Sequence, residues 1–124
     1  MTAPSTTFGN YAMLCRGTAI AASDQVAIST LGAAPDTAVI STSGSISGDS
    51  TRIWRNGVEG NAGTGEHGSG NFISASIFVG SRNGALAYYK GLVQTILIRG
   101  GTRLTNTERQ AAEQYVAGRI GITI

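Results

Sequence analysis

The sequence predicts an all-β domain, a sandwich or barrel, that ends in one short helix. Between Thr7 and about Ile98, short apolar runs alternate with Gly, Ser, Asn and Asp, a pattern typical of short strands joined by turns. A helical apolar pattern follows near the C-terminus. The chain has 124 residues, 18 of them Gly, and 13% are charged. This length predicts a single domain over residues 1–124 with its own core.

Three strands are expected in the first third of the chain. They are Phe8–Arg16, Gln25–Thr30 and Thr37–Thr42, and Pro35-Asp36 marks a turn before the third. Residues 1–8 are polar and show no periodic pattern, so we expect an extended N-terminal arm that reaches onto a neighbouring chain.

A β-hairpin is expected over Thr51–Glu59. Alternation places Ile53 on one face and Trp54 on the other, and Asn56-Gly57 suits a tight type I′ turn. The following stretch, Glu59–Asn71, is rich in glycine and nearly free of apolar side chains. It is therefore predicted to be a mobile loop.

Two further strands are expected in the second half of the chain. Asn71–Gly80 alternates and predicts a strand with one mostly apolar face, and Ser81–Gly84 reads as a turn. Ala87–Arg99 is the longest strand-like run. Because Leu92–Ile98 is apolar on both faces at most positions, we expect it to lie centrally in a sheet.

The predicted helix begins with a capping box, in which Thr105 and Glu108 each satisfy the other's backbone amide. Gly118 is expected to end it. The face expected to pack holds Ala112, Tyr115 and Val116. The alternating residues Ile120, Ile122 and Ile124 then predict a short strand or an extended tail.

Charge and hydropathy exclude several partners. The net charge is +2, and the nine basic residues, eight of them Arg, are scattered along the chain. No basic stripe for nucleic acid is therefore expected. No apolar run approaches the ~20 residues of a membrane span, and the N-terminus lacks the pattern of a signal peptide. We expect neither membrane insertion nor secretion.

Catalytic, metal and cofactor sites are not expected. Cys15 and His67 cannot together form a tetrahedral zinc site, and Cys15 is expected to pack as a small hydrophobe. His67 lies in a glycine-rich stretch and is interpreted as a solvated loop histidine. No predicted strand carries two carboxylates, as glycoside hydrolysis would need. The G-x-G-x-x-G spacing that starts at Gly63 falls in a loop and predicts no nucleotide site.

Aromatic side chains offer candidate sugar contacts. Trp54, Arg55 and Tyr88 are the candidate glycan-contact residues, since an exposed aromatic ring can stack on a sugar. The alternative is that Trp54 packs under a neighbouring loop or against another subunit.

Four segments resemble, in their order and spacing, parts of concanavalin A-like, laminin-G-like jelly-roll domains. They are Arg52–Val58, Ile77–Gly80, Gly91–Ile98 and the ending Leu104–Arg109 with Tyr115–Ala117 and Gly121-Ile122. The resemblance implies an antiparallel two-sheet jelly-roll sandwich. The E-x-D-x-x-E strand of the glucanase members is absent. The part up to Asp36 is short for the family, so the sandwich is either trimmed or completed by a partner chain.

The resemblance implies binding rather than catalysis, because domains with this helical ending are frequent in virion proteins of tailed phages. The expected function is a non-catalytic virion surface protein, made in the host cytoplasm: a head decoration, spike or tail-fibre component that touches host glycans. The alternative is a free-standing carbohydrate-binding module. Expected partners are further copies of the chain and other virion proteins, because a sandwich that lacks strands exposes apolar faces and unpaired edges.

Overall fold

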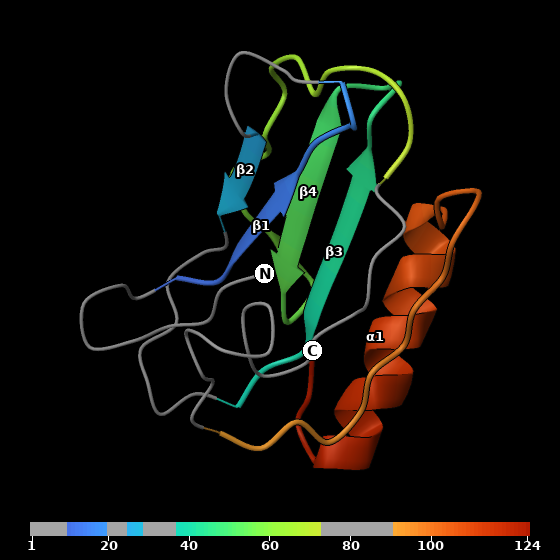
Figure 1. Cartoon of the computed structure of the whole chain (residues 1–124). Coiled ribbons are helices and arrows are strands. Elements are labelled where there is room, and N and C mark those ends of the chain that lie inside the picture. The colour runs from blue at the N-terminus through green and yellow to red at the C-terminus, as the bar shows by residue number, and fades with distance from the viewer. Residues whose placement is uncertain (1–9, 20–24, 29–36, 73–90) are drawn as a thin grey trace.

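A computed structural model describes residues 10–19, 25–28, 37–72 and 91–124 of the chain. The described residues form short antiparallel strands and one C-terminal helix (Figure 1). The elements are β1 (Ala12–Cys15), β2 (Gln25–Ile28), β3 (Ile40–Ser45), β4 (Ser50–Arg55), β5 (Val58–Glu59) and α1 (Asn106–Ile120). This mostly β arrangement with a terminal helix agrees with the predicted class.

The strands form two antiparallel sheets. β1 pairs with β2 from Ala12 opposite Ile28 to Cys15 opposite Gln25. β4 lies between β3 and β5 in a three-stranded sheet, with Ile40 opposite Arg55 at one end of the β3–β4 ladder. Both β1 and β2 contact β4, so the smaller sheet packs against the larger one.

The hairpin turn at Asn56-Gly57 has the predicted geometry. Asn56 has a φ of 49° and Gly57 a φ of 81°, the positive values that a type I′ turn requires. The Asn56 side chain also accepts a hydrogen bond from the Val39 amide at 2.9 Å, and the Asn56 amide donates to the Val39 carbonyl at the same distance. β3 runs from Ile40 to Ser45 instead of the predicted Thr37–Thr42, because its first residue pairs with Arg55, where β4 ends and the turn begins.

β4 is covered on both faces. Ile53 is fully buried and packs with Tyr11, with Met13, Ala38 and Ile40 around them. The next residue, Trp54, points to the opposite face by strand alternation. It is 4% exposed because Arg109 of α1 lies over its ring.

Helix α1 begins as predicted and ends later than predicted. The Thr105 hydroxyl accepts from the Glu108 amide at 3.2 Å, and the Thr105 amide donates to the Glu108 carboxylate at 2.8 Å. The prediction that Gly118 ends the helix is wrong. The left-handed cap is Gly121, with a φ of 72° and its amide bonded to the Ala117 carbonyl.

The inward face of the helix agrees with the prediction in part. Ala112 and Val116 of the predicted face are half-buried, but Tyr115 is 57% exposed, and Glu113 and Ala117 are the buried residues. The contact of Arg109 with the Trp54 ring turns the side of the helix that carries Arg109 and Glu113 toward the sheet, and this leaves Tyr115 at the surface. After Gly121, Ile122 and Ile124 are half-buried and Thr123 is exposed, so the tail alternates without forming a strand.

The predicted central strand over Ala87–Arg99 is wrong for the residues that the structure describes. Residues 91–99 form no strand, and Leu92 and Ile98 are 77% and 68% exposed. None of the described sheets pairs with this segment, so its backbone has no ladder to join.

Several predicted elements lie wholly or partly outside the described residues. Asn71 and Phe72 lie outside any strand, and the rest of Asn71–Gly80 is outside the described residues. So are the turn at Ser81–Gly84, the candidate Tyr88 and the arm at residues 1–8. Within the ranges described, no helix has the length and apolar character needed to cross a bilayer.

Candidate functional site

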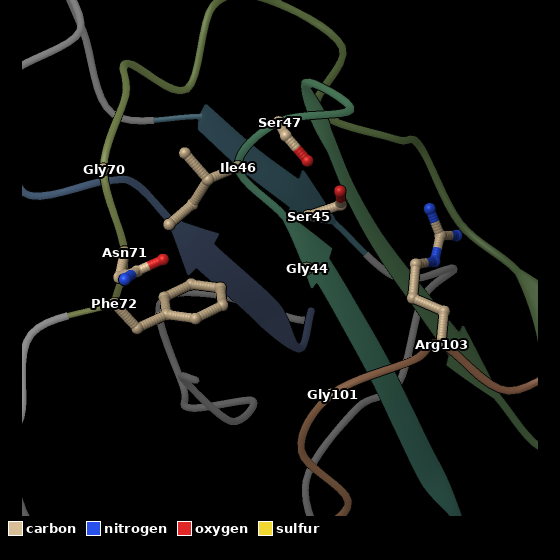
Figure 2. Close-up of a pocket in the computed structure, with 9 residues that line it drawn as sticks. All are labelled: Gly44, Ser45, Ile46, Ser47, Gly70, Asn71, Phe72, Gly101 and Arg103. Carbon is tan, nitrogen blue, oxygen red and sulfur yellow. The ribbon is translucent and has the colours of Figure 1, made fainter.

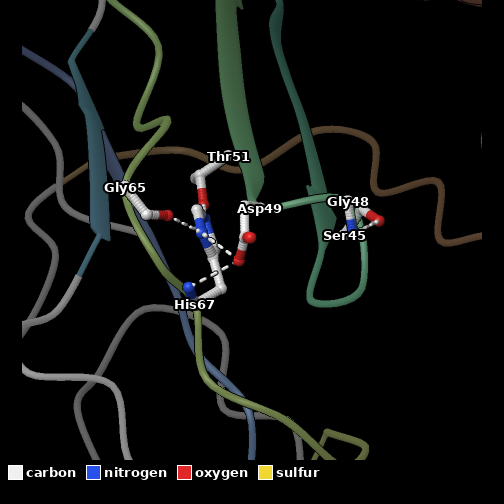
Figure 3. Close-up of polar contacts among 6 residues, drawn as sticks. All are labelled: Ser45, Gly48, Asp49, Thr51, Gly65 and His67. Atoms are coloured by element: carbon white, nitrogen blue, oxygen red, sulfur yellow. Dashed lines mark hydrogen bonds and ion pairs between the residues drawn. The ribbon is translucent and has the colours of Figure 1, made fainter.

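A cluster of hydrogen-bonded polar residues surrounds His67, which is fully buried (Figure 3). Its Nε2 lies 2.6 Å from the Thr51 hydroxyl, and its Nδ1 lies 2.6 Å from the Gly65 carbonyl oxygen. The His67 amide donates to the Asp49 carboxylate at 2.8 Å. The interpretation of His67 as a solvated loop residue is therefore wrong.

The hydrogen bonds assign the tautomer of this imidazole. A carbonyl oxygen can only accept, so Nδ1 carries a proton, and in the neutral imidazole Nε2 then accepts from the Thr51 hydroxyl. The Asp49 carboxylate lies 3.7 Å from Nδ1. Carboxylate, imidazole and hydroxyl are the parts of a hydrolytic triad. Here, however, Thr51 and His67 are both fully buried, so no substrate can reach the hydroxyl. The cluster ties three segments together.

Cys15 extends the same network. Its side chain is 2% exposed, and burial raises the pKa of the thiol, with a smaller opposing effect from its hydrogen bond to Thr51. A thiol with a raised pKa stays protonated and is a poor nucleophile and metal ligand. Among the residues with described positions, no three metal-ligating side chains come together.

Of the predicted sugar-contact residues, Trp54 and Arg55 lie within the described structure. The Arg109 guanidinium carbon lies 4.4 Å from the centre of the Trp54 ring, and Arg109 also bonds both carboxylate oxygens of Glu113 at 2.6 Å. A sugar could stack on that face of Trp54 only after displacing Arg109, which favours the packing interpretation. Arg55 is half-buried at the end of β4. Tyr88 lies outside the described residues.

A hollow of about 300 Å³ lies beside the end of β3 (Figure 2). Its wall combines an aromatic ring, an arginine, two serines and an asparagine with three glycines. The lining residues are Gly44, Ser45, Ile46, Ser47, Gly70, Asn71, Phe72, Gly101 and Arg103. Sequence patterns alone did not reveal this site, because its residues come from three separate segments. The feature of the sequence that could have indicated it is the glycine close to polar residues in each of the three segments.

The second surface feature is the apolar segment, which we define as residues 92–98. Five of its side chains are substantially exposed: Leu92, Val93, Ile96, Leu97 and Ile98. Exposed apolar side chains scattered singly are ordinary, but a contiguous set marks an interaction surface.

Comparison of the chain with models of protein families, with curated proteins and with solved structures found no match.

Proposed function

We propose that this chain is a non-catalytic structural subunit of a phage virion surface, where it associates with further copies of itself and with other virion proteins. The observation that carries the proposal is the apolar segment. Its exposure ranges from 45% at Val93 to 77% at Leu92, over residues that include no charged side chain. Burying such a surface gains roughly 25 cal/mol per Å² without the cost of desolvating a charge.

Free strand edges also support association. β3 and β5 are the outer strands of the three-stranded sheet as described. An unpaired edge offers backbone donors and acceptors to a strand from another chain. The apolar segment consists mainly of residues with high strand propensity and forms no strand in the isolated chain. We therefore propose that it becomes a strand when the subunits assemble.

The finer fold proposal is a trimmed two-sheet jelly roll. The packing of β1 and β2 against β4 supports two layers, and the resemblance of Arg52–Val58 to a jelly-roll hairpin is consistent with the observed β4–turn–β5. On this proposal, the strands that the front of the chain lacks are supplied by a neighbouring subunit.

The buried triad-like cluster supports a role without catalysis. The most reactive groups in the described structure are the Cys15 thiol and the Thr51–His67 pair, and all three are closed to substrate.

The test is the oligomeric state of the full chain, measured by mass photometry over a range of concentrations. We expect an oligomer that becomes monomeric in the double variant Leu92→Ser, Leu97→Ser. The control is Val58→Ser, which removes a residue of similar exposure, 56%, on β5. A wild-type chain that stays monomeric contradicts the assembly role.

The virion location needs a separate measurement. Mass spectrometry of purified phage particles should find the chain in stoichiometric amount. Its absence from particles whose infected host expresses it would contradict the location while leaving the assembly result intact.

A further inference from the structure

The hollow beside β3 has a composition that selects one class of ligand. It lies among three segments. These are the end of β3 with the turn that follows it, residues 70–72, and residues 101–103. In Figure 2, Phe72 and Asn71 stand on one side, Arg103 on the other, and the side chains of Ser45 and Ser47 lie between them. An aromatic face and a cation therefore flank a hydroxyl-lined centre.

Glycines keep this space open. A Cβ at Gly44 would lie 2.7 Å from the Cys15 sulfur and 3.6 Å from the Phe72 ring. Gly70 and Gly101 have φ values of 84° and 85°, which disfavour any residue with a side chain. The absence of side chains at three lining positions is thus required by the backbone and by packing.

The polar groups of the hollow are available to a ligand. The nine lining residues include no acidic side chain, and no carboxylate in the described part of the chain forms an ion pair with Arg103. The Ser45 oxygen accepts from the Gly48 amide at 3.1 Å, which leaves its hydroxyl hydrogen free to donate. Phe72 is 57% exposed, so its ring offers a flat apolar surface.

We propose that this hollow binds a carboxylated sugar residue of the uronic-acid type. One C–H face of the sugar packs on Phe72, its hydroxyls bond Ser45, Ser47 and Asn71, and its carboxylate pairs with Arg103. Arginine holds a carboxylate with two parallel hydrogen bonds, so Arg103 sets the preference for an acidic sugar. A free phosphate would leave Phe72 unused, and an apolar aromatic ligand would leave the hydroxyls unused.

The volume fits this assignment. About 300 Å³ is the lower end of the range for ligand pockets and accommodates one or two sugar rings. The inference rests on the proposed function, since it names the class of host glycan that a virion surface subunit would touch. Its test uses the isolated chain and does not depend on assembly.

The experiment is titration of the ¹⁵N-labelled full chain, followed by NMR, with digalacturonate and with the matched neutral disaccharide galactobiose. We expect shifts at Gly44, Asn71 and Gly101, and at least tenfold weaker binding of the neutral sugar. Arg103→Met should abolish the preference for the acidic sugar, and Phe72→Ala should weaken binding of both. Both side chains are exposed, so both variants should keep the wild-type melting temperature.

The control variant is Arg119→Met, which removes an exposed arginine that lies over Tyr115 on α1. It should leave digalacturonate binding unchanged. Equal loss in this variant, or shifts spread over the surface, would show non-specific charge attraction and overturn the proposal. So would inorganic phosphate binding as tightly as digalacturonate with no effect of Phe72→Ala, or no binding of either sugar. None of these outcomes bears on the oligomeric state.

Discussion

Residues 60–72 and residues 91–99 each have a structure opposite to the one that their composition predicts. The first stretch is rich in glycine and poor in apolar side chains, yet it is anchored to two other parts of the chain. Gly63 and Thr51 exchange two backbone hydrogen bonds of 2.9 Å, and Ser69 and Ala19 exchange two more. The second stretch is apolar, yet it forms no strand and is mostly exposed.

The difference shows that hydrogen-bond partners, and not apolar content, determine which of these two stretches is anchored to the rest of the chain. His67 bonds four different residues through its ring nitrogens, its amide and its carbonyl, so this one residue is a main anchor of the glycine-rich stretch. Residues 91–99 have apolar side chains but no neighbouring ladder among the described strands. Apolar content favours burial, whereas a strand also needs an edge with which to pair.

The largest expected effect is at the centre of the anchored stretch. His67→Ala leaves a cavity and removes the imidazole that bonds the buried Thr51 hydroxyl, so we expect a loss of about 3 kcal/mol in the free energy of unfolding. Urea denaturation measures it. The control Glu66→Gln changes an exposed neighbour and should cost no more than about 0.5 kcal/mol. Equal effects of the two variants would mean that His67 is not an anchor.

Two glycines with ordinary backbone angles give a matched comparison of the two regions. A Cβ at Gly17 would overlap the Ser69 carbonyl group, whereas a Cβ at Gly100 meets no atom within 4 Å. Gly17→Ala should therefore destabilise the fold by about 2 kcal/mol, because backbone must move to admit the methyl group. Gly100→Ala should be neutral or stabilising by up to about 1 kcal/mol. Thermal melts that rank the two variants in the opposite order would break the comparison.

Helix α1 begins at the capping box, after the apolar segment. The contribution of the capping box to stability can be tested by its dependence on pH. Thr105→Ala should cost about 1 kcal/mol at neutral pH. Hydrogen bonds from the Thr105 amide and hydroxyl lower the pKa of Glu108 below its ordinary value, with a smaller contribution from Arg99. A lowered pKa stabilises the fold above the ordinary carboxyl pKa, and this contribution is lost as pH falls through the lowered value.

The cost of Thr105→Ala should accordingly shrink in acid, as measured by urea denaturation at neutral pH and again below the lowered pKa. Thr107→Ala, two residues further into the helix, is the control and should have little effect at either pH. A cost for Thr105→Ala that stays constant over this range would argue against the hydrogen bond from the Thr105 hydroxyl to the Glu108 carboxylate.

The smallest expected effect is in the apolar segment itself. Leu92→Ser should change the free energy of unfolding of the dilute monomer by no more than about 0.5 kcal/mol, because the side chain is already 77% exposed. Denaturation at concentrations below the association range measures this. A loss above about 1.5 kcal/mol would show that Leu92 is packed within the monomer.

Local signals in the sequence predicted the elements that depend on local chemistry. The Asn56-Gly57 turn and the Thr105–Glu108 capping box are each specified within four residues, and both are confirmed. β1 and β2 lie inside their predicted ranges. The hairpin alternation also placed Ile53 and Trp54 on opposite faces.

The features that were missed depend on contacts between distant segments. The buried state of His67 requires Thr51, Asp49 and Gly65 to surround it, and sequence spacing alone does not show this. The hollow beside β3 likewise joins residues from three segments. Tyr115 was wrongly expected on the inward face of α1, because the contact that sets this face, Arg109 over the buried Trp54 ring, joins two distant segments.

The contact between Arg109 and Trp54 gives the chain a built-in optical probe. Trp54 is the single tryptophan of the sequence, and its ring lies at the contact of β4 with α1. Detachment of the helix would expose the indole to water and move its fluorescence emission to longer wavelength. Far-ultraviolet circular dichroism follows loss of the helix and the strands together. If the two signals change over the same range of urea, the helix and the sheets unfold as one cooperative unit. If emission changes first, α1 detaches while the sheets remain folded.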